Sequence, residues 1–321
     1  MTQNILVVTE HLKGEFADVT YELLGKGREL ATSTGGTLTA AVLGSGMQEN
    51  IGSLGAADRV VYVDHAQLAD FNPETHVNAL TEVISSTTPR LTLIANTSMG
   101  MDLAAGLSAR GNLPLVAYAV DVVIEGNDVI ATSQLYGGKI YAESVIAGEA
   151  GIVSVLAGAF PADPGRADGA PEVEQVDALA GLDGGQIQFK ELIEPVGGDV
   201  DITQHELLVA VGRGLQSDDN LPMVEELAAA LGGAVCASRP IVDNKWLPKT
   251  RQVGKSGLKV KPKVYLALGI SGAPEHIEGM KTAELIIAVN TDVTAPIFEH
   301  AHYGTTLDLF DVVPALTQKL Q

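Results

Sequence analysis

Hydrophobic positions in the first third of the chain alternate between short apolar runs of strand length and longer stretches with helical spacing. The apolar runs predict strands over Asn4–Thr9, Thr37–Leu43, Arg59–Val63 and Leu91–Ala95. The helix-spaced stretches predict helices over Thr20–Thr32, Asn72–Ser85 and Gly100–Arg110. Strands that alternate with helices of this length are typical of βαβ units, so the pattern predicts a parallel sheet.

The pattern changes after Leu115 to consecutive apolar runs joined by short turns. These runs predict strands over Tyr118–Ile124, Val129–Leu135, Lys139–Ile146 and Ile152–Leu156. Because antiparallel neighbours need only a short turn between them, we expect an antiparallel extension of the parallel sheet.

The middle of the chain predicts a boundary between two domains. Phe160–Gly185 is rich in Pro, Gly, Ala and Asp and predicts a surface connection, and Gln186–Ile193 predicts one last strand. Pro195–Asp199 marks the boundary, which divides the chain into residues 1–194 and 195–321.

Alternation of strands and helices resumes after the boundary. The predicted elements are strands over Glu206–Val211, Ala234–Ala237, Val264–Leu268 and Leu285–Val289, a helix over Asp219–Leu231, and a closing helix from about Thr306. The predicted fold class is therefore α/β: an N-terminal domain with a mostly parallel sheet plus an antiparallel extension, and a doubly wound C-terminal domain.

Composition excludes several classes of protein. The 321 residues are 46% hydrophobic and 19% charged, which is enough to bury a core and excludes a disordered chain. No apolar stretch reaches the roughly 18 residues of a membrane helix, and no basic leader precedes an apolar segment, so we expect a cytoplasmic protein without membrane insertion. The single cysteine, Cys236, excludes internal disulfides and a cysteine-ligated cluster. The net charge of −20 argues against nucleic-acid binding.

Positive charge gathers in one segment of the C-terminal domain. Arg239–Lys263 holds eight Lys and Arg residues and one acid, Asp243. Charge alone fits a solvated surface loop as well as it fits a binding site.

Three glycine-rich segments make a cofactor site the better interpretation. Gly212-Arg213-Gly214 and Gly269–Ala273 each follow a predicted strand, and Gln252–Gly257 lies within the basic segment. Glycine at the carboxyl end of a parallel strand lets backbone N–H groups approach a phosphate closely. The three segments together predict a site for a phosphate-bearing cofactor.

Two familiar nucleotide motifs do not fit these segments. Gly254-Lys255-Ser256 resembles the end of a P-loop, but Lys249 stands where that motif needs its first glycine. Gly212-Arg213-Gly214 resembles a dinucleotide fingerprint, but Ser217 replaces the third glycine. Because Arg239 could accept a 2′-phosphate, an NADP-dependent oxidoreductase remains an alternative.

No hydrolytic or metal constellation stands out in the sequence. His300 and His302 have no evident third ligand, so no metal site is predicted.

The C-terminal domain resembles the alpha subunit of electron-transfer flavoproteins. The resemblance rests on an ordered set of motifs: Val211–Leu215, Ala237–Arg239, Gln252–Gly257, Leu268–His276 with Gly279-Met280, Ala288–Asn290, Ala295–Phe298, and Asp308–Phe310 with Val313-Pro314. It covers residues 205–321, whereas the N-terminal domain matches the family only in length and βα pattern.

This resemblance implies an electron-carrier subunit rather than an enzyme. It implies one FAD in the C-terminal domain, a beta subunit that contacts the N-terminal domain, and electron relay from flavin dehydrogenases, such as acyl-CoA dehydrogenases in fatty acid β-oxidation, to a quinone reductase. The family's AMP site lies in the beta subunit, so no AMP is assigned to this chain. The positions that match the family's FAD contacts are Arg213, Ser238, Arg239, Val253, Gly254, Lys255, Ser256, Ser271, Gly272, Ala273, Pro274, Glu275, His276, Asn290, Asp308 and Leu309.

The resemblance also implies roles for several of these residues. His276 would act as a donor or cation at the flavin N1–C2=O edge, Arg239 would lie close to the ring, and Ser256 would place its hydroxyl near flavin N5. The Gly254 and Gly272 turns would bring backbone amides to ribityl and phosphate oxygens.

Some positions depart from the family pattern. Lys255-Ser256 replaces a common Gln-Thr pair, and Pro274-Glu275 replaces an apolar residue and Gln. These changes leave the redox potential and the partners open. A bifurcating electron-transfer complex and a scaffold with a vestigial site remain alternatives.

Overall fold

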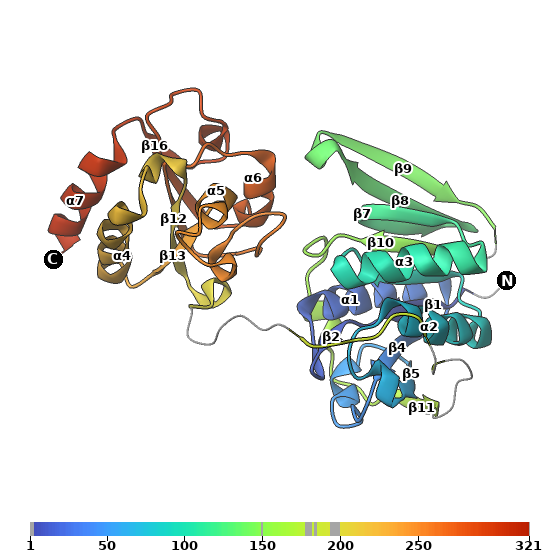
Figure 1. Ribbon diagram of the computed structural model, residues 1–321. Helices are drawn as coiled ribbons and strands as arrows, with labels where there is room; N and C mark the ends of the chain where they lie inside the picture. Colours follow the sequence, from blue (N-terminus) through green and yellow to red (C-terminus); the bar gives the residue numbers. More distant parts are fainter. Residues whose placement is uncertain (1–2, 149, 177–181, 183–184, 193–199, 321) are drawn as a thin grey trace. The chain divides into compact units, whose positions relative to one another are not determined.

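The computed structural model describes residues 3–148, 150–176, 182, 185–192 and 200–320 (Figure 1). The chain divides into an N-terminal unit, Met1–Glu191, and a C-terminal unit, Leu192–Gln321. The boundary predicted at Pro195–Asp199 lies outside the described residues.

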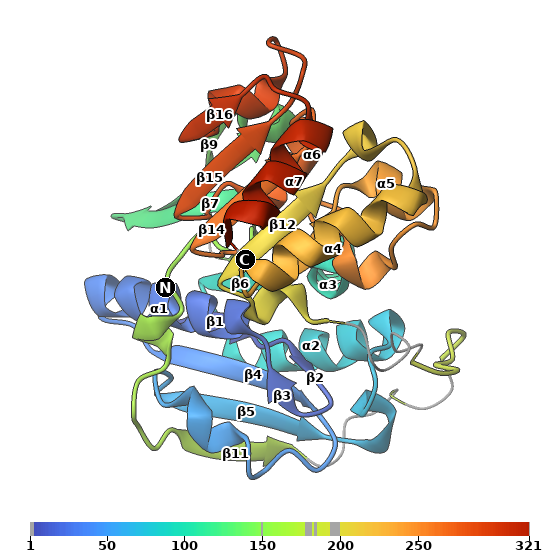
Figure 2. The ribbon, with the colours of Figure 1, turned by 90° about the vertical axis from the view of Figure 1, so that its left-hand side faces the viewer.

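The N-terminal unit is built on a nine-stranded sheet in the order β11-β5-β4-β1-β6-β10-β7-β8-β9. Its strands are β1 (Ile5–Val8), β4 (Leu38–Gly44), β5 (Arg59–Asp64), β6 (Leu91–Ala95), β7 (Leu115–Glu125), β8 (Asp128–Leu135), β9 (Ile140–Ile146), β10 (Gly151–Val155) and β11 (Glu172–Val176). Figure 2 shows β4, β5 and β11 side by side at one end of this sheet. A small separate hairpin pairs β2 (His11–Leu12) with β3 (Glu15–Phe16).

Side chains that alternate along β1 explain why helices cover both faces of this sheet. Ile5 and Val7 pack with the buried side chains of α1 (Asp18–Thr34), whereas Leu6 and Val8 pack with those of α2 (Pro73–Thr87) and α3 (Ser98–Gly111). Strands that are buried on both faces are apolar throughout, as parallel strands between helices are.

The antiparallel extension is confirmed for three strands and wrong for the fourth. β7, β8 and β9 pair antiparallel, but β10 lies between β6 and β7 and is parallel to both. Although only a short link joins β9 to β10, the chain returns across the sheet, and β10 fills the central position between β6 and β7.

Two predictions in the middle of the chain are also wrong. Phe160–Gly185 is more than a connection, because it contains β11, which pairs in parallel with β5 at the sheet edge. Its buried Gly165 also packs against the backbone of Tyr21 in α1. The strand predicted over Gln186–Ile193 is absent from the described residues 186–192. β11 was missed because its exposed edge position gives it alternating charges rather than an apolar run.

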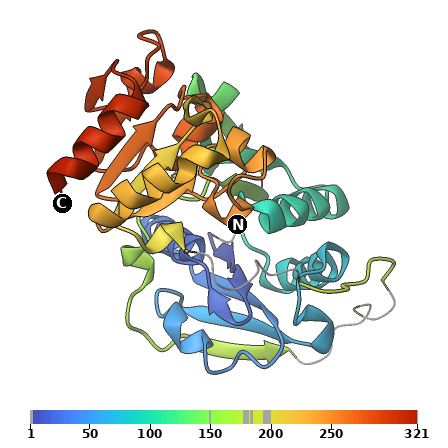
Figure 3. The same cartoon turned by 60° about the vertical axis from the view of Figure 1, so that its left-hand side comes forward.

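The C-terminal unit has a five-stranded parallel sheet in the order β13-β12-β14-β15-β16. The strands are β12 (Leu207–Val211), β13 (Ala234–Ala237), β14 (Val264–Leu268), β15 (Leu285–Val289) and β16 (Tyr303–Thr305). One face packs against α6 (Pro274–Met280), and the other packs against α4 (Leu221–Ala230) and α7 (Leu309–Leu320). Figure 3 shows α4 and α7, coloured gold and red, along the same side of the sheet.

The sequence did not predict the two short helices of this unit. The predicted basic loop begins as α5 (Arg239–Asp243), with Pro240 in its first turn, and Pro274 likewise begins α6. Proline suits the first turn of a helix because the missing N–H has no acceptor there.

Candidate functional site

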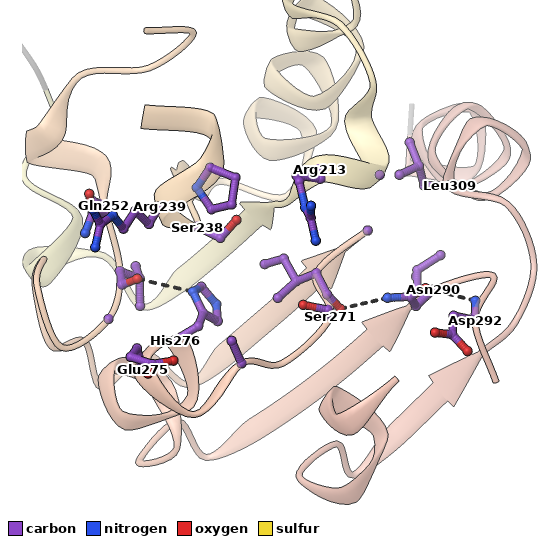
Figure 4. Close-up of a pocket in the computed structure, with 18 of the residues that line it drawn as sticks. Arg213, Ser238, Arg239, Gln252, Ser271, Glu275, His276, Asn290, Asp292 and Leu309 are labelled. Atoms are coloured by element: carbon purple, nitrogen blue, oxygen red, sulfur yellow. Dashed lines mark hydrogen bonds between the residues drawn. The ribbon is translucent and has the colours of Figure 1, made fainter. Parts of the chain in front are cut away.

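A cavity of about 770 Å³ opens in the C-terminal unit at the carboxyl ends of its strands. The chain passes from β12 to β13 on one side and later to β14 on the other, so the strand order reverses between β12 and β14. Ligands of open α/β sheets bind at such a reversal. Figure 4 shows side chains from several strand ends lining the cavity.

Fourteen of the sixteen predicted site residues line this cavity, although they are spread over about a hundred positions. They are Arg213, Ser238, Arg239, Val253, Gly254, Lys255, Ser256, Ser271, Ala273, Glu275, His276, Asn290, Asp308 and Leu309.

The other two, Gly272 and Pro274, do not line the cavity. Gly272 has φ of 87°, and a Cβ atom there would lie 2.3 Å from the Ile297 amide nitrogen. This glycine is therefore needed for the turn and for close packing on Ile297. Pro274 starts α6.

Backbone hydrogen bonds tie the two central strand ends together. The Gly212 amide donates to the Leu268 carbonyl at 2.9 Å, and the Gly214 amide donates to the Gly269 carbonyl at 3.1 Å. After this junction the chain turns, and no acceptor in the described part of the chain takes the amide N–H of Ser271 or Ala273. Two backbone donors beside the cavity suit an anionic ligand.

The loop that carries Gly254 closes on itself and on α6. Gly254 has φ of 138°, and a Cβ atom there would lie 2.8 Å from the Glu275 carbonyl oxygen, so only glycine fits. Its amide donates to the Leu258 carbonyl at 3.1 Å, and the Lys255 amide donates to the Glu275 carbonyl at 2.7 Å. The amides of Gly254 and Lys255 therefore hold the loop closed, and the role predicted for this turn toward a ligand stays a prediction.

Two arginines differ in how their charge is balanced. Arg239 is exposed and its Nε lies 3.3 Å from the Asp243 carboxylate one helical turn away, and both side chains line the cavity. Arg213 also lines the cavity, and no carboxylate in the described part of the chain pairs with it. Arg213 is therefore the better placed of the two to balance a ligand's negative charge.

His276 lines the cavity as a neutral ring whose two nitrogens are both engaged inside the protein. Its Nδ1 lies 3.2 Å from the Val253 carbonyl oxygen, and its Nε2 lies 2.9 Å from the Tyr265 hydroxyl. A carbonyl can only accept, so Nδ1 carries the proton and Nε2 accepts from Tyr265. Burial lowers the pKa of His276 to about 4. In this arrangement both ring nitrogens are engaged within the protein, and the role of His276 as a cation or N–H donor toward a ligand stays a prediction.

Tyr265 and Cys236 form a buried layer behind His276. Both are fully buried, and the Tyr265 hydroxyl lies 4.0 Å from the Cys236 sulfur. Burial raises the pKa of the Cys236 thiol to about 12. The pair therefore supports the ring from within the protein and does not reach the cavity.

Several lining residues were not assigned a role from the sequence. They include Gln216, Pro240, Gln252, Thr291 and Asp292. Gln252 lies inside one of the motifs named above, and Thr291 and Asp292 directly follow Asn290, which ends another. Their position in or beside a motif was therefore a usable signal. Gln216 has positive φ and no such signal in its residue type.

No group of three or more His, Cys, Asp or Glu residues that could hold a metal ion occurs in the described ranges. His302 instead accepts the Ile286 amide at 2.9 Å through Nδ1. Within the same ranges, every helix is too short or too polar to cross a membrane.

The fold and the cavity define a class. A doubly wound domain with glycine turns, free backbone donors and an unpaired arginine at the reversal of its strand order is typical of proteins that bind nucleotide cofactors. Two family models match the chain: the electron transfer flavoprotein domain over residues 5–180, and the electron transfer flavoprotein FAD-binding domain over residues 201–281.

Curated relatives match along nearly the whole chain. An electron transfer flavoprotein subunit alpha of Mycobacterium tuberculosis is 38% identical over 99% of this chain and 98% of its own length. The protein of that name from Clostridium acetobutylicum is 34% identical over 99% and 97%. A lactate dehydrogenase (NAD(+),ferredoxin) subunit LctC of Acetobacterium woodii is 33% identical over 99% and 77%. The chain belongs to the electron transfer flavoprotein alpha-subunit family.

Proposed function

We propose that this chain binds one FAD in the cavity of its C-terminal unit and carries electrons as the alpha subunit of a heterodimeric electron-transfer flavoprotein. The observation that supports this most directly is the cavity of about 770 Å³, which falls within the size range of cofactor sites and collects fourteen of the sixteen predicted FAD contacts. The electrons would pass from flavin dehydrogenases, such as acyl-CoA dehydrogenases, to a quinone reductase.

The donors around the cavity fit the chemistry of FAD. Arg213 and the amides of Ser271 and Ala273 suit the pyrophosphate, and the hydroxyls of Ser238 and Ser256 suit polar atoms of the ribityl chain and ring. When bound, FAD would supply the ability to accept and release electrons singly. The protein would bind and orient it, and would set how easily it is reduced.

Fixed positive charge is the property by which these residues would set the potential. Reduction adds negative charge to the flavin, so a nearby cation stabilises the reduced form. At an effective dielectric constant of about 20, a cation about 4 Å away contributes about 4 kcal/mol. Arg239, which the family pattern puts close to the ring, would carry this role, whereas His276 is neutral at pH 7.

The beta subunit is the expected partner, and the N-terminal unit has an apolar surface that supports this. Strand β9 forms the outer edge of the nine-stranded sheet. Exposed large apolar side chains occur on β9, on the turn before it and at the end of β8: Leu135, Tyr136, Ile140, Tyr141 and Val145. An exposed apolar edge strand is a liability unless another chain covers it.

Expression with the beta subunit, followed by absorbance spectroscopy and nucleotide analysis, tests the proposal. We expect a yellow heterodimer with one FAD in this chain, reduced by an acyl-CoA dehydrogenase and its substrate. A folded, colourless complex that takes up no FAD, or one that binds NADPH tightly and no flavin, would contradict it. The cytoplasmic location stays a prediction.

A bifurcating complex is the second candidate function. The supporting observation is the similarity to a subunit of a lactate dehydrogenase that uses NAD(+) and ferredoxin. Finding a second FAD in the partner subunit, together with NADH-dependent reduction of ferredoxin, would favour it over the simple carrier.

A further inference from the structure

Four carboxylate side chains line the cavity of the C-terminal unit, and three of them are engaged by the protein. Asp243 pairs with Arg239, and Asp292 and Asp308 each accept the backbone N–H two residues further along the chain. Glu275 is the fourth (Figure 4). It is exposed, and within the described ranges no group donates a hydrogen bond to its carboxylate or forms an ion pair with it. Among these four, Glu275 is therefore the carboxylate that the described protein leaves unsatisfied.

The backbone holds Glu275 at the cavity although its side chain is unpartnered. Its carbonyl accepts the Lys255 amide at 2.7 Å, and a Cβ atom on Gly254 would lie 2.8 Å from the same carbonyl oxygen. The next residue, His276, is held through both of its ring nitrogens. The carboxylate can change rotamer, but the backbone that carries it stays fixed beside the cavity.

A carboxylate beside the cavity acts differently on the two redox states of a bound flavin. Reduction adds negative charge to the ring, so the repulsion between the ring and a nearby carboxylate is larger in the reduced state than in the oxidised state. The carboxylate therefore makes the flavin harder to reduce, which is the opposite of the effect of a cation.

We infer that Glu275 is a specificity-determining residue that lowers the midpoint potential of the bound flavin. This inference rests on the proposed function. A lower potential restricts the electron donors of the carrier to those that are reducing enough to pass an electron to it, and it makes the reduced carrier a stronger reductant toward its acceptor. Glu275 would thus select among partners through the energy of the electron rather than through direct contact with them.

A series of charges at position 275 tests this inference in the FAD-loaded heterodimer. Glu275→Gln should favour one-electron reduction of the bound FAD about fivefold, because charges about 4 Å apart interact with about that strength even in water. At about 59 mV per tenfold, this is a rise of about 40 mV in the midpoint potential, measured by spectroelectrochemical titration. Glu275→Lys should raise the midpoint further, and Glu275→Asp, which keeps the charge, should stay near the wild-type value.

The matched control lies on the same short helix. Glu278 belongs to α6 but does not line the cavity, so Glu278→Gln removes the same charge from the same helix away from the flavin. A midpoint that rises in the order Asp, Gln, Lys at position 275, with a smaller shift in Glu278→Gln, supports the inference. An unchanged midpoint in Glu275→Gln, or an equal shift in Glu278→Gln, overturns it.

The lysine variant keeps the test valid if the glutamine variant does not fold, because a midpoint at or below the wild-type value in Glu275→Lys also overturns the inference. Failure of the wild-type heterodimer to bind FAD contradicts the proposed function instead. The two failures are therefore distinguishable.

Discussion

Both units of this chain contain a sheet in which the strand order reverses, but they differ in the space at the point of reversal. In the N-terminal unit the reversal lies between β1 and β6, and the space at their carboxyl ends is only about 40 Å³. His11, Phe71, His76 and Met99 line that space. In the C-terminal unit the reversal lies between β12 and β14, and the cavity measures about 770 Å³.

The difference shows that the strand order sets where a cavity can form, whereas the residues that follow each strand decide whether that cavity stays open. β12 and β14 are followed by Gly212 and Gly269, whose segments are joined through backbone hydrogen bonds and leave room above them. β1 is followed by Thr9, Glu10 and His11, whose side chains occupy the corresponding space. Burial raises the pKa of Glu10, whose carboxylate accepts a hydrogen bond from the Thr97 hydroxyl.

Closing the open cavity is expected to have the largest effect. Gly254→Val places a branched side chain at φ of 138° and against the Glu275 carbonyl, which costs about 3 kcal/mol or more in local strain and overlap. FAD binding should weaken at least about 100-fold, as measured by flavin fluorescence titration. Gly52→Ala, where nothing lies within 4 Å, is the control and should change neither binding nor stability appreciably.

Acid should weaken both units through one buried histidine in each. Burial lowers the pKa of His76 and of His276 to about 4, below the ordinary value of 6.5. The unfolded chain therefore takes up these protons first, and the free energy of unfolding falls as the pH drops from about 6.5 toward 4. Each histidine should cost about 2 kcal/mol between pH 7 and pH 5.

Urea unfolding at the two pH values measures this loss. His76→Gln should reduce the loss in the N-terminal unit only, and His276→Gln should reduce it in the C-terminal unit only. His300→Gln, at an exposed position, serves as the control. An unchanged pH dependence in both buried variants would contradict the assignment.

The two arginines of the cavity should differ in effect. Arg213→Ala should weaken FAD binding by about 1.5–3 kcal/mol, since it removes a cation that no described carboxylate balances. Arg239→Ala should have a smaller effect, because Asp243 already offsets its charge. Calorimetric titration and the flavin midpoint potential check this order; equal losses would show that the ion pair opens on binding.

A helix cap in the N-terminal unit should have the smallest effect and none on the flavin. The Thr97 hydroxyl accepts the Gly100 amide at 3.0 Å and donates to the Glu10 carboxylate. Thr97→Ala should lower the free energy of unfolding by about 1 kcal/mol. FAD affinity should stay at the wild-type value, and a loss of affinity would show that the two units are coupled.

The sequence was sufficient to predict buried strands and the cavity, because apolar runs and glycine turns each have one main structural role there. Apolar runs located nearly every buried strand, and the glycine and serine motifs after β12, β13 and β14 located the cavity. Edge strand β11 was missed because exposed charges hide its alternation, and β10 was misplaced because pairing partners are not encoded in a link's length.

The roles of individual site atoms were less predictable than the site itself. The position of His276 was predicted, but its protonation depends on Tyr265 and on the Val253 carbonyl, which only the folded backbone brings to it. Gln252 was quoted within a motif, yet its contact with Ser256 depends on the closure of the loop between them.

The burial of Cys236 makes it a natural chemical reporter. It is the chain's only thiol, it lies in β13 of the C-terminal unit, and with its pKa near 12 it should resist alkylation while that unit stays folded. The rate of alkylation would then register each opening of the C-terminal unit and ignore the N-terminal one. A single reagent could in this way time the opening of the C-terminal half by itself, with no label introduced.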